Sequence, residues 1–232
     1  MKMLLMVFGC SLLMFSYSPI HTMQASQSSQ KSQKTSAEVL ERVAVALGKE
    51  QLARVDMVAE GTVTVFDEKK SAALKVALLR NGEHQSQRIL LYQAGKIWDG
   101  HGENLTPEGK RALDFLETQY MRGPRRLLKA GAGSVVVTAT ELKLQEDNRE
   151  ETSYFLESGS SRLSHFEFEQ GEPMDPKGRG RPNLHSYSFS DYRGTDSIAT
   201  PFHVEHDLNG SKQEELVLTA VRYIPATRVR NP

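Results

Sequence analysis

Residues 61–100 read GTVTVFDEKK SAALKVALLR NGEHQSQRIL LYQAGKIWDG, and this stretch decides the fold. Polar and apolar side chains alternate along it with a period of two, which is typical of half-buried β-strands. Asn81-Gly82-Glu83 and Ala94-Gly95 have the chemistry of tight turns, so successive strands should fold back on one another. We therefore expect an antiparallel meander with strands at Gly61–Phe66, Ala72–Arg80, Gln87–Gln93 and Lys96–Gly100.

A helical pattern separates this meander from a second set of strands. Thr106-Pro107 can cap and open a helix whose apolar face extends to Tyr120, and Gly123-Pro124 ends it. A shorter helix is expected at Arg125–Ala130. The period of two then returns and predicts strands at Ser134–Leu144, Thr152–Glu157, Arg162–Gln170, Asn183–Tyr192, Pro201–Leu208 and Glu214–Ile224.

Upstream of the meander, residues 37–47 carry apolar side chains at helical intervals, and Gly48 is placed to end this helix. The preceding tract, Ser26–Ser36, has no apolar residue and cannot bury enough surface to order itself. We expect a flexible Ser/Gln-rich leader over residues 26–36 and a single β-rich domain over residues 37–232.

The first 25 residues have the features of a secretory signal peptide. Lys2 is followed by an apolar run at Met3–Phe15 and later by a small residue, Ala25, in the order that such signals show. The run is shorter than the roughly 20 residues that span a bilayer, which favours cleavage over a permanent anchor. We expect an exported protein, periplasmic or secreted, from which residues 1–25 are removed.

Cys10 is the only cysteine, and Val7-Phe8-Gly9-Cys10 resembles the lipid-attachment box of bacterial lipoproteins. The segment before Cys10 is short for that role and the apolar run continues past it, so a lipid anchor is the less favoured interpretation. If Cys10 leaves with the signal, the mature chain has no thiol and therefore no disulfide.

The charges of the chain balance. It contains 29 basic and 29 acidic residues, and because Lys2 lies in the signal segment the mature chain keeps 28 basic and 29 acidic residues, a net charge of −1. This balance offers no general attraction to nucleic acid or anionic lipid. Basic residues cluster at Arg122–Arg126 and at Lys177–Pro182. The second cluster lies within a Pro/Gly loop, Gly171–Pro182, that we expect to be solvated. The alternative is that this loop contacts a lipid headgroup or a partner.

The number of strands predicts the overall shape. Ten or so antiparallel strands exceed what one flat open sheet tolerates, so the sheet should curve strongly or close. The fold class is mainly β (α+β): a strongly curved antiparallel sheet or half-barrel of about 10–11 strands, with an N-terminal helix and a helical lid. The residues expected on the inner face and the lid are the candidate ligand-binding residues: Val63, Val65, Leu74, Val76, Leu78, Trp98, Phe115, Leu116, Tyr120, Phe166, Phe168, Tyr187, Phe189, Phe202, Val204, Leu216 and Leu218.

Motifs of enzymatic chemistry are missing from the sequence: it contains no GxSxG, P-loop, GxGxxG after a strand, HExxH or CxxC. His203-Val204-Glu205-His206 comes nearest to a metal site, but a strand places His203 and Glu205 on one face and His206 on the other. We expect ordinary surface or edge histidines there, with metal ligation as the alternative. His165 and His185 should be hydrogen-bonded wall residues. The sequence predicts that the protein is not an enzyme and that it holds no metal or cofactor.

The order of elements resembles that of the bacterial LolA/LolB-like family of periplasmic lipoprotein carriers. The residues that carry the resemblance are short local patterns: Ala37–Gly48 with Val58–Gly61, Leu90–Gly100, Thr106–Ala130, Ser153–Leu163, Phe189–Arg193, Thr200–Val204, Asn209–Ser211 and Val217–Tyr223. The resemblance implies a half-barrel whose open side is crossed by the helices of Thr106–Ala130.

Two functions from different classes follow. The first is a non-catalytic binding or carrier protein for an apolar ligand, such as lipid or lipoprotein acyl chains, held between the concave sheet and the lid. The second is an interaction or sensor domain of the cell envelope that binds a protein partner through the Gly171–Pro182 loop or a sheet edge.

Overall fold

A computed structural model provides the structure of the protein. It describes residues 35–68, 70–82, 86–99, 105–131, 134–138, 141–145, 151–171, 182–195 and 198–225. The expected signal peptide, Cys10, most of the expected leader and residues 172–181 of the basic loop lie outside the described residues, so those expectations remain predictions.

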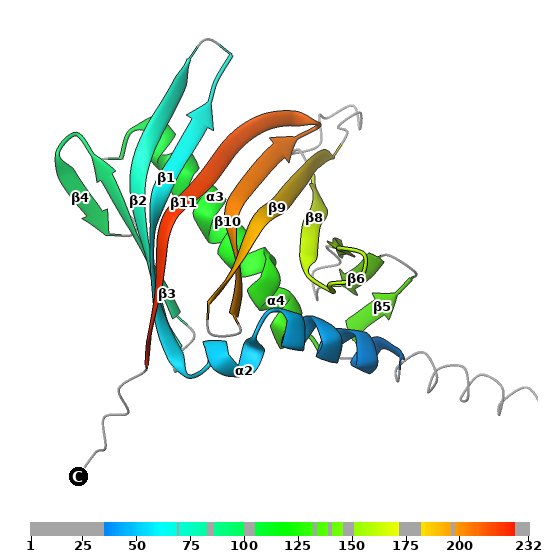
Figure 1. Ribbon diagram of the computed structural model, residues 1–232. Helices are drawn as coiled ribbons and strands as arrows, with labels where there is room; N and C mark the ends of the chain where they lie inside the picture. Colours follow the sequence, from blue (N-terminus) through cyan, green and yellow to red (C-terminus); the bar gives the residue numbers. More distant parts are fainter. Residues whose placement is uncertain are drawn as a thin grey trace, which may run out of the picture.

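The strands form one antiparallel sheet of eleven members in the order β4-β3-β2-β1-β11-β10-β9-β8-β7-β6-β5. The sheet is strongly curved and does not close, because β4 and β5 are its two edges (Figure 1). The strands are β1 Val55–Phe66, β2 Ser71–Asn81, β3 Ser86–Gln93, β4 Lys96–Asp99, β5 Val135–Val137, β6 Glu141–Gln145, β7 Glu151–Leu156, β8 Leu163–Gln170, β9 Asn183–Thr195, β10 Ile198–Leu208 and β11 Ser211–Pro225.

The helices gather on the concave side of this sheet (Figure 1). Residues 35–46 are helical and are followed by α2, Lys49–Leu52; the main helix is α3, Pro107–Arg122, and α4, Pro124–Lys129, continues from it. Among the described residues, no helix has the length and apolar character needed to cross a membrane.

Local chemistry sets the bounds of α3. The Thr106 hydroxyl accepts a hydrogen bond from the Gly109 N–H at 3.2 Å, and Pro107 occupies the first turn, where its missing N–H costs nothing. The helix ends at Gly123, whose N–H donates to the Gln119 carbonyl at 2.9 Å. The sequence prediction of both ends is confirmed.

Several predicted boundaries differ from the structure, and two of them are informative. Ser134–Leu144 was expected to be one strand, but it divides into β5 and β6, and the Thr138 N–H donates to the Glu141 carbonyl at 2.9 Å across the connection. That prediction is wrong because the segment contains no glycine, proline or asparagine to indicate a turn. The strand that was predicted to begin at Gly61 begins at Val55 instead. Gly61 lies inside β1, at a bulge where the pairing with β11 shifts.

The core lies between the concave face and α3. Phe166 and Tyr187 stack on adjacent strands with ring centroids 4.8 Å apart, and Phe115 of α3 stacks on Tyr187 at 5.9 Å. The buried Tyr154 hydroxyl donates to the carbonyl of Arg122 at 2.6 Å, which fixes the end of α3 to β7. Alternation therefore turned the aromatic residues inward, as predicted.

Candidate ligand-binding site

A cavity of about 130 Å³ lies between the concave sheet and the junction of α3 and α4. Strands β1, β2, β3, β10 and β11 form one wall, and the two helices with the end of α2 form the other. Most of its lining is apolar: Leu47, Leu52, Met57, Leu78, Leu128, Pro124, Ile198, Ala199, Pro201, Val204, Leu216 and Leu218. An apolar enclosure of this kind suits a hydrocarbon chain.

Polar groups occupy part of this lining. Arg80 comes from β2, Gln87 from β3 and Arg125 from α4. Burial lowers the pKa of Arg80, and the nearby charge of Arg125 acts in the same direction. The Arg125 guanidinium lies over the ring of Tyr120, 4.2 Å from its centroid, and burial raises the pKa of that tyrosine.

At the β10–β11 side of the cavity, the Thr200 and Tyr223 hydroxyls are hydrogen-bonded to each other. Burial raises the pKa of Tyr223, so its hydroxyl stays protonated and can donate.

The structure distributes the predicted site residues over three environments. Leu78, Tyr120, Val204, Leu216 and Leu218 line this cavity. Phe115, Phe168 and Tyr187 line a second cavity, described below. The others are buried in the core or packed against it: Val63, Val65, Leu74, Val76, Trp98, Leu116, Phe166, Phe189 and Phe202. Ligand contact by any of these residues remains a prediction.

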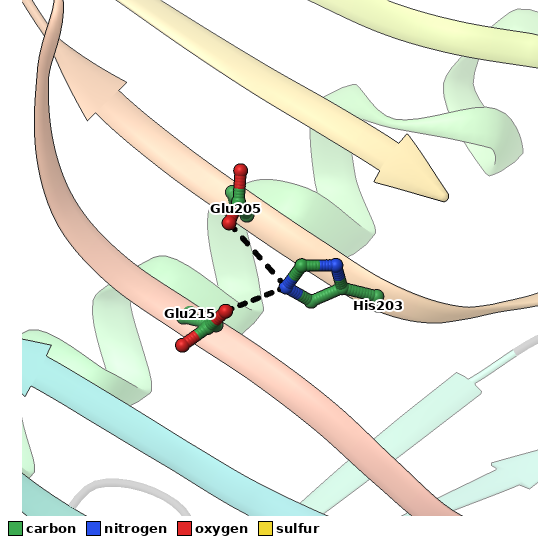
Figure 2. A group of neighbouring side chains, drawn as sticks. All are labelled: His203, Glu205 and Glu215. Carbon is green, nitrogen blue, oxygen red and sulfur yellow. Dashed lines mark hydrogen bonds and ion pairs between the residues drawn. The ribbon is translucent and has the colours of Figure 1, made fainter. Parts of the chain in front are cut away.

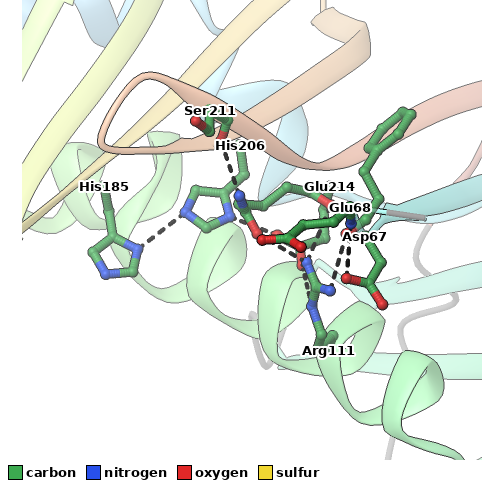
Figure 3. A network of polar contacts seen from close by, with 9 residues as sticks. Asp67, Glu68, Arg111, His185, His206, Ser211 and Glu214 are labelled. Carbon is green, nitrogen blue, oxygen red and sulfur yellow. Dashed lines mark hydrogen bonds and ion pairs between the residues drawn. The ribbon is translucent and has the colours of Figure 1, made fainter. Parts of the chain in front are cut away.

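The second cavity, of about 210 Å³, lies under the N-terminal half of α3 and is more polar. Glu214 accepts hydrogen bonds from Arg111 and, at 2.7 Å, from Nδ1 of His206 (Figure 3). Nε2 of His206 lies 3.0 Å from Nδ1 of His185. Because a carboxylate accepts from His206 Nδ1, a neutral His206 presents Nε2 as an acceptor and His185 donates to it.

His206 corrects a prediction, because it is buried and is not a surface or edge histidine. Strand alternation places it on the inner face with Phe202 and Val204, where it stacks on Tyr187 at 4.4 Å. The structure agrees better with the prediction that His185 and His165 are hydrogen-bonded wall residues. His185 stacks on Phe168, and burial lowers its pKa.

On the opposite face of β10, His203 lies beside two carboxylates (Figure 2). Its Nε2 is 2.6 Å from Glu215 and 3.4 Å from Glu205. The predicted separation of His203 and Glu205 from His206 is confirmed. These three side chains are of types that bind divalent metals, and their ligand atoms lie within 4.8 Å of one another.

A cation of the protein already occupies this position. The Lys212 ammonium pairs with both Glu205 and Glu215. Burial acts to raise the pKa of Glu215, but the hydrogen bond from His203 and the charge of Lys212 outweigh it and lower that pKa. A metal ion would have to displace Lys212, so the cluster is complete as a salt-bridge network.

No protein-family model and no curated protein matches the sequence. Among solved structures, a domain described as an outer membrane lipoprotein-sorting protein from Vibrio parahaemolyticus is similar in fold, with 12% identity over 77% of this chain and 91% of that chain and a TM-score of 0.42. A DUF1329 family protein from Desulfovibrio piger has 10% identity over 80% of this chain and 92% of that chain, with a TM-score of 0.46. A LolA superfamily protein from Nitrosomonas europaea has 12% identity over 78% of this chain and 93% of that chain, with a TM-score of 0.38.

The likeness is one of fold. Two of these proteins are described as lipoprotein-sorting and LolA superfamily proteins, the family that the sequence resembles. At such low identity, the matches leave ligand and site residues to be argued from this chain alone.

Proposed function

We propose that this protein is a non-catalytic binding or carrier protein of the bacterial cell envelope, whose ligand is a molecule with an apolar chain, such as a lipid or the acyl chain of a lipoprotein. The observation that carries the proposal is the position of the apolar cavity. It is walled by the sheet on one side and by α3 and α4 on the other, so a bound chain would lie between them.

The size of the cavity bears on how a ligand enters. At about 130 Å³ it is smaller than the roughly 300–1,000 Å³ of a typical small-molecule site. It therefore accommodates part of one chain with the helices in place, and a longer chain requires α3 and α4 to move away from the sheet. Such a displacement would have to break the Arg111–Glu214 ion pair and the hydrogen bond from Tyr154 to the Arg122 carbonyl, which hold α3 to the sheet.

The test measures binding of a neutral apolar probe, N-phenyl-naphthylamine, to the full mature chain by fluorescence. Val204→Phe adds volume to a buried residue of the cavity wall and should weaken probe binding about tenfold or more. Val217→Phe is the matched control, because Val217 is exposed on the other face of the sheet and should leave binding unchanged.

Native mass spectrometry of protein purified from the periplasm adds a second measurement. Co-purifying lipid in the wild type, reduced in Val204→Phe and retained in Val217→Phe, supports the proposal. A lipid-free wild-type protein that also fails to bind the probe would overturn it.

A further inference from the structure

Three polar side chains lie together in the wall of the apolar cavity. Arg80 on β2 and Gln87 on β3 are directly opposite each other in the β2–β3 register. Arg125 reaches the same cavity from α4. The charged groups therefore come from both walls, so a group bound between them would contact the sheet and the helix together.

One side-chain nitrogen of each of these residues makes no hydrogen bond within the protein. The Nε atoms of Arg80 and Arg125 and the Nε2 atom of Gln87 are buried without a hydrogen-bond partner. Buried polar groups are nearly always satisfied, because an unsatisfied donor loses its hydration without compensation. Three side chains that line one cavity, each with an unsatisfied donor, indicate that an acceptor belongs there.

The surrounding charges identify the acceptor as an anion. Within the described part of the chain, neither Arg80 nor Arg125 has an ion-pair partner, whereas Lys129 adds another positive charge nearby. Burial lowers the pKa of Arg80, which reflects the cost of holding its charge there. An anionic group would offset that cost through charge-assisted hydrogen bonds to the guanidinium.

We propose that the cavity binds a single-chain anionic amphiphile, with Arg80, Arg125 and Gln87 holding its carboxylate or phosphate and the apolar wall holding its chain. This inference rests on the proposed function and adds a headgroup class to it. A fatty acid and a lysophosphatidate share the required chemistry: one chain that ends in an anion able to accept two or more hydrogen bonds. The cavity volume favours one chain over two.

The experiment displaces N-phenyl-naphthylamine from the full mature chain with ligands of equal chain length, below their critical micelle concentrations. Myristate and myristoyl lysophosphatidate carry the anion, myristyl alcohol is neutral and myristyltrimethylammonium is cationic. We expect myristate or the lysophosphatidate to displace the probe at about tenfold lower concentration than the alcohol, and the cation to be the weakest. The anion that displaces the probe at the lower concentration shows whether the site prefers a carboxylate or a phosphate.

The variant Arg80→Gln should reduce the preference for the anion over the alcohol to less than about threefold. The matched control is Arg88→Gln, because Arg88 is exposed and pairs with Asp99 outside the cavity. Thermal unfolding of Arg80→Leu gives an independent readout. Removing a partly buried charge whose Nε has no hydrogen-bond partner should keep or raise the melting temperature.

Equal displacement by acid and alcohol would overturn the headgroup inference and leave the proposed function standing. An anion preference that survives in Arg80→Gln and Arg125→Gln would also overturn it. Failure of the folded protein to bind the probe or any of the amphiphiles would instead overturn the proposed function itself.

Discussion

Arg111 of α3 and Glu214 of β11 form an ion pair that fastens the main helix to the centre of the sheet. Arg111 Nη2 lies 2.7 Å from Glu214 Oε1, and Nε donates to the same oxygen at 2.9 Å (Figure 3). Arg111 also donates to the Phe66 carbonyl at 3.0 Å and to the Gln213 side-chain oxygen at 3.1 Å. One guanidinium thus joins α3 to the end of β1 and the start of β11.

Replacement of Arg111 by methionine should lower the free energy of unfolding by about 1.5–3 kcal/mol, because Glu214 would stay buried with its charge less well compensated. Urea denaturation measures the loss. Arg54→Met is the control: Arg54 pairs with Glu50 on the surface, and its removal should cost less than about 0.5 kcal/mol. Equal losses in the two variants would contradict a special role for the Arg111–Glu214 pair.

Phe166 is fully buried and stacks on Tyr187 at the centre of the aromatic core. Phe166→Ala should cost about 3–5 kcal/mol, since it removes a large apolar side chain and leaves a cavity. Phe166→Leu, which fills more of the space, should cost less. Chemical denaturation ranks the two, and a Phe166→Leu variant as unstable as Phe166→Ala would show that packing volume is not what Phe166 contributes.

The inner face of the sheet was largely predictable, because alternation fixes which residues point together. Phe166, Phe168, Tyr187 and Phe189 fall on it as expected. The same rule also contained a signal for Arg80, which follows Leu74, Val76 and Leu78 at intervals of two, but Arg80 was not among the predicted site residues. His206 was expected at the surface or an edge, although it continues the series Phe202, Val204.

Other features could not be predicted from the sequence. The contact of Arg111 with Glu214 joins residues far apart in the chain, and only the packing of α3 across the sheet brings them together. The cavity likewise depends on how far the helices stand from the sheet. Periodicity fixes the direction of side chains and carries no information about that distance.

Gly61 lies where the backbones of β1 and β11 approach closely. A Cβ added there would be 2.5 Å from the Val217 carbonyl oxygen, which is a backbone atom, at the bulge between Glu60 and Gly61. Gly61→Ala should therefore destabilise the protein by about 1–3 kcal/mol. Gly131→Ala is the control, because nothing lies within 4 Å of a Cβ at that position. Thermal unfolding of both variants tests this, and a Gly61→Ala melting temperature equal to that of Gly131→Ala would refute the close approach.

The last prediction concerns acid. Burial lowers the pKa of His185, and the charges of His206 and Arg122 act in the same direction, while Glu214 and Asp114 oppose them. The unfolded chain, with a histidine pKa of about 6.5, then takes up a proton before the folded chain does. Stability is present in full above that value and decreases as the pH falls from it toward the lowered folded-state pKa.

Burial lowers the pKa of His165 too, against the opposing charge of Glu167, so both histidines contribute to this acid sensitivity. The free energy of unfolding, measured by urea denaturation from about pH 7.5 to about pH 5, should decline in the wild type, less in His185→Phe and least when His165→Phe is added. The pKa of Glu108 is lowered to about 2, so that carboxyl group titrates below this window. A His185→Phe profile parallel to that of the wild type would mean that the lowered pKa of His185 does not contribute, because the slope depends only on the difference in bound protons between the two states.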